Sequence, residues 1–222
     1  AVLVLNRSGL DVWASSQFYD MVSSSFPLRD QYLYSGVLHA GLKNLSVLAW
    51  LALLLTCLCV GLSNRFGLAM PFAFSPSLQS GLRFILVSSF LCASVVAWLK
   101  SQSAHSCPWD LTSFGGPYDF FYLGTSLTDL TFDFGPGKCF PSGHASVGWM
   151  WIGLLFISGA SRPLRVLQWL VVGLALLVSV TQVVRGAHFP SHVLMTAVIC
   201  WVIAVLAYHA YPWVFKLRSQ VS

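Results

Sequence analysis

Charge is what this chain has least of. Only 9% of its 222 residues are charged, glutamate is absent, and seven aspartates carry all of the acidic side-chain charge. Soluble domains carry about a quarter charged residues. With 56% hydrophobic residues beside so few charges, the chain cannot build a water-exposed surface. The composition therefore excludes an ordinary soluble protein and predicts a polytopic membrane protein.

Several other signals are also missing. The sequence has no basic run, no CxxC pair, no cysteine and histidine spacing of the zinc-site kind, no internal repeat and no low-complexity tract. We therefore expect no nucleic-acid partner, no metal and no other cofactor, and we infer no obligate protein partner. The net charge of +5 is interpreted as membrane anchoring.

Hydropathy predicts an all-α helix bundle with five membrane spans. A span needs about 20 apolar residues, and the third candidate is shorter than that. The opening string AVLVLN suggests the end of an upstream helix, which would give the full-length protein six spans. The five candidates are residues 45–62, 82–99, 145–157, 166–184 and 193–214.

We expect a single membrane-embedded domain over residues 1–222. Residues 1–44 should form an outward surface segment, with short amphipathic helices within 7–43, because serines able to cap helices occur there. Residues 45–215 should form the bundle. Loops 100–144 and 185–192 should lie at the same membrane face as the surface segment.

The orientation follows from lysine and arginine, which are enriched in cytoplasmic loops. These residues flank the connections after the first and third spans and also follow the last span. The long connection on the other side, loop 100–144, carries four aspartates and only two lysines. The basic residues in question are Arg65, Arg83, Arg162, Arg165, Lys216 and Arg218.

Two of the six cysteines, Cys107 and Cys139, fall in the long outward loop, and the other four lie in predicted spans. An extracellular or periplasmic loop is oxidising, so these two can form a disulfide. The alternative is a pair of free thiols near the membrane.

Three polar clusters are predicted at one membrane face, and each brings a cation or a histidine. They are Lys100 with SQSAHSCP, then KCFPSGHAS at 138–146, then RGAHFPSH at 185–192. Gly143 lets the backbone approach a ligand closely, Ser142 can cap the next helix or donate to an oxygen, and His144 can deliver a proton. The alternative for this cluster is a plain helix start with an interfacial histidine.

The other clusters have similar pairs of interpretations. Arg185 offers forked donors that suit a phosphate, and His188 lies beside it. The alternatives are an anchor for Arg185, a headgroup contact for His188 and simple snorkelling for Lys100. His105 is expected at the rim of the pocket, whereas His39 and His209 are expected at the membrane interface.

In these clusters the sequence resembles the type 2 phosphatidic acid phosphatases (PAP2), over roughly residues 80–205. That family's pattern is K-x6-R-P, then P-S-G-H, then S-R-x5-H-x3-D. PSGH is complete at 141–144, and Lys100, Pro108 and His188 align. Four positions depart from the pattern: Cys107 replaces the first arginine, Thr181 and Gln182 replace the serine–arginine pair, and His192 replaces the aspartate.

The resemblance implies a metal-free phosphohistidine mechanism, with His188 as nucleophile and His144 as general acid and base. The family's phosphate pocket uses one lysine and two arginines, and both arginines are missing here. We expect Arg185 and Lys138 to replace them beside Lys100, Ser142 and Gly143. His192, or a nearby acid such as Asp133 or Asp129, is expected to orient the nucleophile.

These observations favour a membrane phosphatase acting on a lipid phosphate or diphosphate, resembling the lipid A and undecaprenyl diphosphate phosphatases. The expected location is the bacterial inner membrane, with the site facing the periplasm or exterior. Two alternatives remain: a lipid phosphotransferase using the same intermediate, and a non-catalytic lipid-binding relative.

Overall fold

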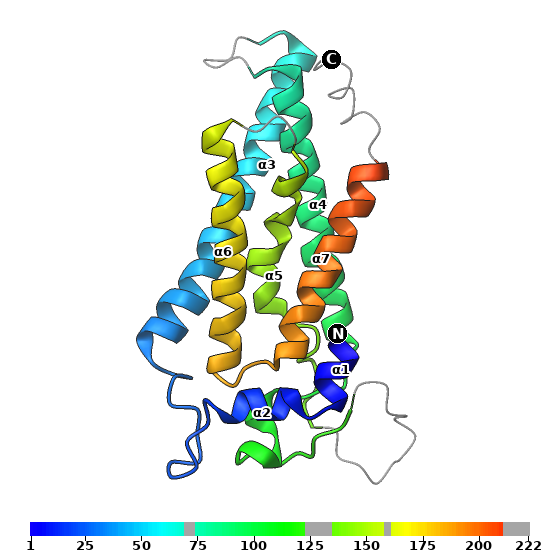
Figure 1. Cartoon of the computed structure of the whole chain (residues 1–222). Helices are drawn as coiled ribbons and strands as arrows, with labels where there is room; N and C mark the ends of the chain where they lie inside the picture. Colours follow the sequence, from blue (N-terminus) through cyan, green and yellow to red (C-terminus); the bar gives the residue numbers. More distant parts are fainter. Residues whose placement is uncertain (69–73, 123–134, 158–160, 211–222) are drawn as a thin grey trace.

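The computed structural model describes residues 1–68, 74–122, 135–157 and 161–210, and the described chain is all-helical, as predicted. Four of its helices are long and apolar enough to cross a membrane. Figure 1 shows the long helices running side by side as a bundle, with short helices gathered at one end. The first of the four spans Leu33–Phe66, and the others are α4 (Pro76–Ser101), α6 (Arg162–Val184) and α7 (Pro190–Ala210).

The expected third span differs from the prediction, because no long helix forms there. Its sequence instead makes α5 (Gly143–Trp149) and then a 3₁₀ segment, η4 (Met150–Phe156). A 3₁₀ helix rises about 2.0 Å per residue against 1.5 Å in an α-helix, so the whole segment is only about 25 Å long. It is surrounded by longer helices and lies in the middle of the bundle (Figure 1). The four other expected spans begin inside long helices, but the end of the fifth lies outside the described residues.

The bundle core is built from small and medium side chains around α5 and η4. Gly148 packs so tightly on α6 that an added Cβ would come 2.5 Å from the Ala175 Cα atom. Small residues let membrane helices approach closely where no water is present to drive association. One buried cluster joins α4, η4 and α7 and contains Cys92, Val96, Met150, Ile152, Cys200 and Ala204.

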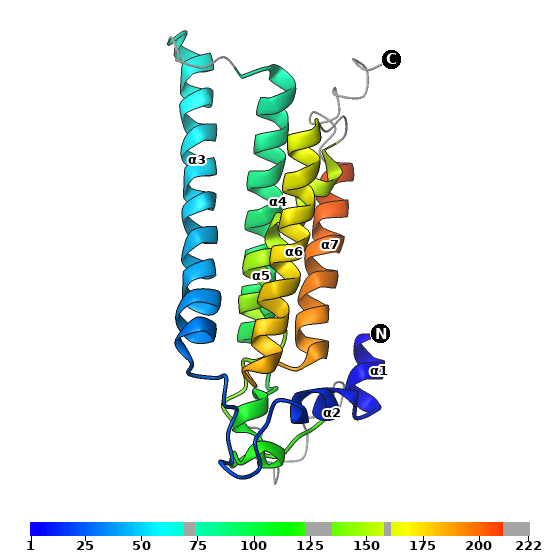
Figure 2. The ribbon, with the colours of Figure 1, turned by 60° about the vertical axis from the view of Figure 1, so that its left-hand side comes forward.

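The helix α3 (Leu42–Phe66) stands at the side of the bundle, as Figure 2 shows. Many of its leucines are exposed, among them Leu48 at 63% and Leu55 at 62%, which suits a face turned to lipid. Its 25 residues make about 37 Å of helix, more than the roughly 30 Å hydrocarbon core. The π-helical segment η1 (Leu33–Gly41) precedes it, so the continuous helix Leu33–Phe66 is longer than the hydrocarbon core requires.

Short helices occupy the end of the bundle near the N-terminus (Figure 1). They are α1 (Val2–Arg7), α2 (Leu10–Ser16), η2 (Pro108–Asp110) and η3 (Thr112–Phe114). Asp11 in α2 is buried and accepts a hydrogen bond of 2.9 Å from the backbone N–H of Ser191, in the first turn of α7. This bond fixes the surface helices to the bundle.

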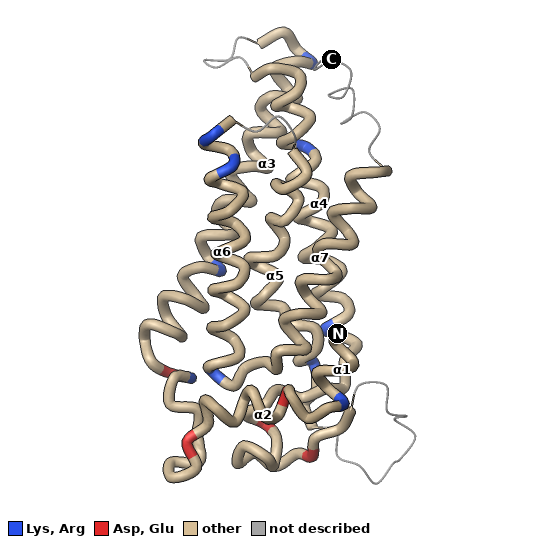
Figure 3. The backbone as a smooth tube through the Cα atoms, viewed as in Figure 1, with Lys and Arg blue, Asp and Glu red and all other residues tan. Residues whose placement is uncertain are grey.

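Charge separates along the long axis of the molecule. Figure 3 shows acidic residues only at the end with α1 and α2, whereas basic residues occur at both ends. Arg162 and Arg165 mark the opposite end, in the first turn of α6. Which end of the bundle faces the cytoplasm stays a prediction from the sequence.

Candidate active site

The three polar clusters of the sequence meet at the end of the bundle that carries α1 and α2. Backbone hydrogen bonds join them directly. The N–H of Cys139 donates to the carbonyl of His105 at 2.9 Å, and the N–H of Ser142 donates to the carbonyl of His192 at 3.2 Å. A third bond of 3.1 Å runs from the N–H of Trp109 to the carbonyl of Gly186. These hydrogen bonds hold together three loops that are far apart in the sequence.

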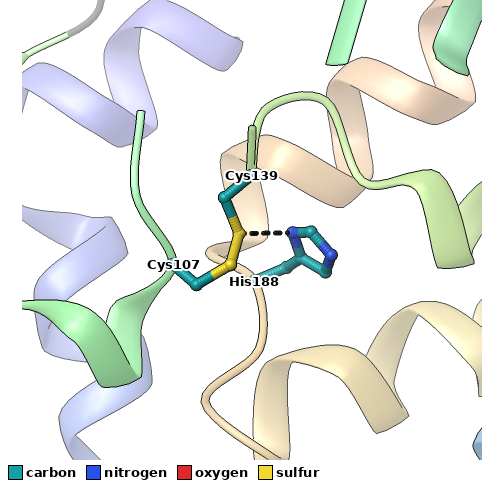
Figure 4. A group of neighbouring side chains, drawn as sticks. All are labelled: Cys107, Cys139 and His188. Carbon is teal, nitrogen blue, oxygen red and sulfur yellow. Dashed lines mark hydrogen bonds between the residues drawn. A yellow bond between two sulfur atoms is a disulfide. The ribbon is translucent and has the colours of Figure 1, made fainter. Parts of the chain in front are cut away.

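Cys107 and Cys139, whose pairing the sequence left open, form a disulfide that contacts His188 (Figure 4). The Nδ1 atom of His188 lies 3.3 Å from the Sγ atom of Cys139. A disulfide sulfur carries no proton, so this contact is a hydrogen bond only in the tautomer that has its hydrogen on Nδ1. The tautomer with Nδ1–H leaves the Nε2 atom of His188 with a free lone pair.

The environment of His188 keeps its ring neutral. The side chain is only 3% exposed, in the turn between α6 and α7. Burial lowers the pKa of His188 well below its usual range, and the neighbouring His192, Lys100 and His144 lower it further. A neutral ring with an unprotonated nitrogen is the form that can act as a nucleophile.

His144, the first residue after Gly143 in α5, lies beside Lys100 and His39. Lys100 packs against this turn so closely that a Cβ added to Gly143 would come 3.2 Å from the lysine Cδ atom. The ring of His39 stacks on the ring of His144, with centroids 3.7 Å apart. His39 in turn contacts Gln182, its Nδ1 atom lying 3.3 Å from the amide oxygen.

Arg185 is buried at the C-terminal end of α6 and is held by the N-terminal segment. Its Nε–H donates to the carbonyl of Arg29 at 3.0 Å, while its Nη1 atom has no hydrogen-bond partner among the described residues. Gly186 adopts a φ of 68°, and the ring of Phe26 covers it so closely that a Cβ there would come within 2.3 Å. The guanidinium of Arg29 lies 4.4 Å over the ring of Trp109. Residues 26–29 therefore cover this turn.

The remaining predicted site residues are less central. The Ser142 hydroxyl caps α5 by accepting from the N–H of Ala145 at 3.2 Å. Lys138 is exposed and is fixed through its backbone N–H, which donates to Ser103, so the structure does not bring its side chain to the histidines. Asp133 and Asp129 lie outside the described residues.

His192, expected to orient the nucleophile, is buried with its ring centroid 5.8 Å from that of His188. Its Nδ1 atom has no hydrogen-bond partner in the described chain. The contact that the structure gives to His188 comes instead from Cys139.

One group of side chains has the spacing of a metal site: Cys107, Cys139 and His188. Metal binding requires thiolates, and the two sulfurs are bonded to each other. In this oxidised form the group does not fit a metal ion.

Two hollows occur in the described part of the structure. A small one is lined by His105, Phe121, His192 and neighbouring residues of the surface segment and long loop. A larger one lies along α6, between Arg162 and Leu177, and is mostly apolar. Neither hollow is lined by His144 or by His188.

The sequence did not single out the contributions of the first 41 residues. His39 was expected at the membrane interface but stacks on His144, and Asp11 and Arg29 were given no role. Spacing alone carries no signal for such contacts, because more than a hundred residues separate each of these residues from its partner. The π-helical form of η1 is typical of functional positions, but it cannot be read from the sequence.

A helical membrane bundle that gathers histidines, a lysine and a buried arginine at one end has the architecture of an integral membrane phosphatase. The chain belongs to the PAP2 superfamily, whose family model matches residues 81–216. The match covers more than half of the chain and includes all three motif clusters. No curated protein and no solved structure matches the chain.

Proposed function

We propose that this protein hydrolyses a lipid phosphate or diphosphate through a phosphohistidine on His188. The contact between His188 and Cys139 carries the proposal. It holds a fully buried, neutral imidazole through Nδ1 and leaves Nε2 available to attack phosphorus. Lys100 and His144 are close enough to act on it electrostatically.

Unpaired donors support an anionic ligand at this place. The Nη1 atom of Arg185 and the Nε2 atom of Gln182 are buried without a hydrogen-bond partner among the described residues. A buried donor left unsatisfied costs about 1–3 kcal/mol. Phosphate oxygens would satisfy both donors, and Lys100 would add positive charge for the transferring group.

The reaction then proceeds in two steps. The Nε2 lone pair of His188 attacks phosphorus while the bond from phosphorus to the lipid oxygen breaks. His144, which becomes protonated only when the phosphate group is bound among the surrounding cations, gives that oxygen its proton. Neutral His144 next removes a proton from water, and the resulting hydroxide displaces His188 from phosphorus. Inorganic phosphate leaves from a monoester, and both histidines return to their starting states.

The position of the site favours a membrane lipid as the substrate. The histidines lie where the apolar helices end, so a polar headgroup can reach them while its tail stays in the bilayer. We propose the outer face of the bacterial inner membrane as the location. The support is that basic residues flank the connections at the opposite end of the bundle, whereas loop 100–144 carries four aspartates and only two lysines. Cell-envelope lipid phosphates and diphosphates are the substrates to test first.

The test is phosphate release from a panel of such lipids by the purified protein in detergent, with EDTA present. We expect His188→Ala to abolish release and His144→Ala to lower kcat by on the order of 10²–10⁴. His209→Ala, at the other end of α7, is the matched control and should retain wild-type activity.

Other results would correct the proposal. An absolute metal requirement would contradict the mechanism, and lipid binding without turnover would identify a binding protein. Transfer of labelled phosphate to a second lipid would identify a phosphotransferase. Trapping an acid-labile, base-stable phosphoprotein that is absent in His188→Ala would identify the intermediate.

A further inference from the structure

His39 is the one imidazole in contact with His144 that belongs to no motif and lies outside the matched residues 81–216. It comes from η1, the π-helical start of the first long helix. Its ring is only 27° from parallel with that of His144. A π-helical segment is rare and occurs frequently at functional sites, where the extra residue in the turn redirects side chains.

The second contact of His39 defines its hydrogen positions. An amide oxygen only accepts, so the Nδ1–H of His39 donates to the Gln182 oxygen at 3.3 Å. In this tautomer the Nε2 atom of His39 carries a lone pair and no hydrogen. Upon protonation, Nε2–H becomes a donor and the ring becomes a cation.

Gln182 occupies the position at which the third PAP2 motif has arginine. It is fully buried, and its amide nitrogen has no hydrogen-bond partner among the described residues. An arginine supplies both forked donors and positive charge from one side chain. Here Gln182 offers a donor at the motif position but carries no charge. The group in contact with Gln182 is the imidazole of His39.

The surroundings of His39 explain when it would become charged. Lys43 on α3 and Arg185 at the end of α6 act on His39, and His144, itself close to Lys100, stacks on its ring. Adding a proton in this cationic environment is unfavourable until an anion enters. A bound phosphate reverses that balance, because it places negative charge among these groups.

We propose that His39 is a phosphate-binding residue that, together with Gln182, takes the place of the missing motif arginine. Gln182 supplies a neutral donor, and His39 takes up a proton as the phosphate group of the substrate binds. This inference rests on the proposed function, since it names a further residue of the same site. It also assigns to His39 the charge that the sequence had led us to expect from Lys138.

Three variants test the charge of His39 separately from its packing. His39→Phe keeps a flat ring against His144 but removes the donor and the charge, and we expect kcat/KM for the lipid phosphate to fall by on the order of 10². Restoring arginine in the double variant His39→Ala, Gln182→Arg should recover at least tenfold over His39→Ala. His209→Ala is the control and should match the wild type.

Binding of inorganic orthovanadate gives a second readout that needs no turnover. Calorimetry at pH 7.5, in buffers of different ionisation enthalpy, should show about one proton more taken up by the wild type than by His39→Phe. Equal proton uptake, or full activity in His39→Phe, would overturn the role of His39 while leaving His188 and His144 in place. If neither the wild type nor any variant releases phosphate, the proposed function fails, and vanadate binding alone decides the role of His39.

Discussion

At the scale of single residues, the most informative contact is the one between the Cys139 sulfur and His188. In the family pattern an aspartate orients the nucleophile, and here that position is His192, which does not bond to His188 in the described structure. A carboxylate both fixes the tautomer and supports the charge that forms on the ring. A sulfur can fix the tautomer but brings no charge, so in the proposed mechanism this contact would orient His188 without activating it strongly.

Two single substitutions separate orientation from covalent bridging. Cys107→Ala and Cys139→Ala both break the disulfide, but only the second removes the sulfur beside His188. We expect Cys139→Ala to lower kcat by about 10–100-fold, as loss of a partner that orients a functional histidine does, and Cys107→Ala to cost less. Equal losses in steady-state hydrolysis would show that the bridge only holds the loops together.

Buried neutral histidines should make the protein sensitive to acid. Burial lowers the pKa of His105 to about 4, and the ring stacks on Phe121 with centroids 4.3 Å apart. Below pH ~6.5 the unfolded chain binds a proton that the folded chain does not, so stability falls as pH decreases from there towards 4, by up to about 1.4 kcal/mol per unit for each such histidine. His188 acts in the same direction.

Thermal unfolding in detergent between pH 8 and pH 5 measures this effect. We expect His105→Asn to show a shallower loss of stability than the wild type, with His209→Asn as the unchanged control. A slope in His105→Asn as steep as in the wild type would contradict the assignment.

At the scale of elements, the bundle depends on the close approach of α5 and α6. Gly148→Ala should lower the free energy of unfolding by about 1–3 kcal/mol, because the new Cβ would overlap Ala175. Gly173→Ala is the matched control: it lies on the exposed side of α6, where an added Cβ meets nothing within 4 Å. Its expected effect is a gain of up to about 1 kcal/mol from helix propensity. Unfolding temperatures in detergent compare the two, and equal values would refute the packing argument.

Elements were predictable from the sequence to the extent that hydropathy determines them. Apolar runs of sufficient length predicted α3, α4, α6 and the start of α7. The segment after His144 was recognised as short, but its change to a 3₁₀ helix at Met150 was not, because that change depends on packing between neighbouring helices. The PSGH motif and His188 were singled out because they lie in polar clusters at predicted helix ends and match the PAP2 pattern. His39 and Asp11 were not, because the folding of the N-terminal segment onto α6 and α7 brings them to their partners.

At the scale of the whole molecule, the distribution of charge predicts which end faces the cytoplasm. Ser113 in η3 and Ser161 before α6 are both exposed and lie at opposite ends of the bundle. In a variant with Cys57 and Cys59 replaced by alanine, a membrane-impermeant maleimide added to intact spheroplasts should label Ser113→Cys and not Ser161→Cys. The reverse labelling pattern would place the histidines on the cytoplasmic side and contradict the proposed location.

The stack of His39 on His144 also has a consequence for how this family should be dissected. A fragment trimmed to the family-matched residues 81–216 would retain every motif position. It would nevertheless lose His39, which stacks on His144, together with the Phe26 ring that covers Gly186. Domain boundaries taken from the family match therefore exclude N-terminal side chains that contact motif residues. Relatives that share the motifs can differ in chemistry through this N-terminal region, which motif searches do not cover.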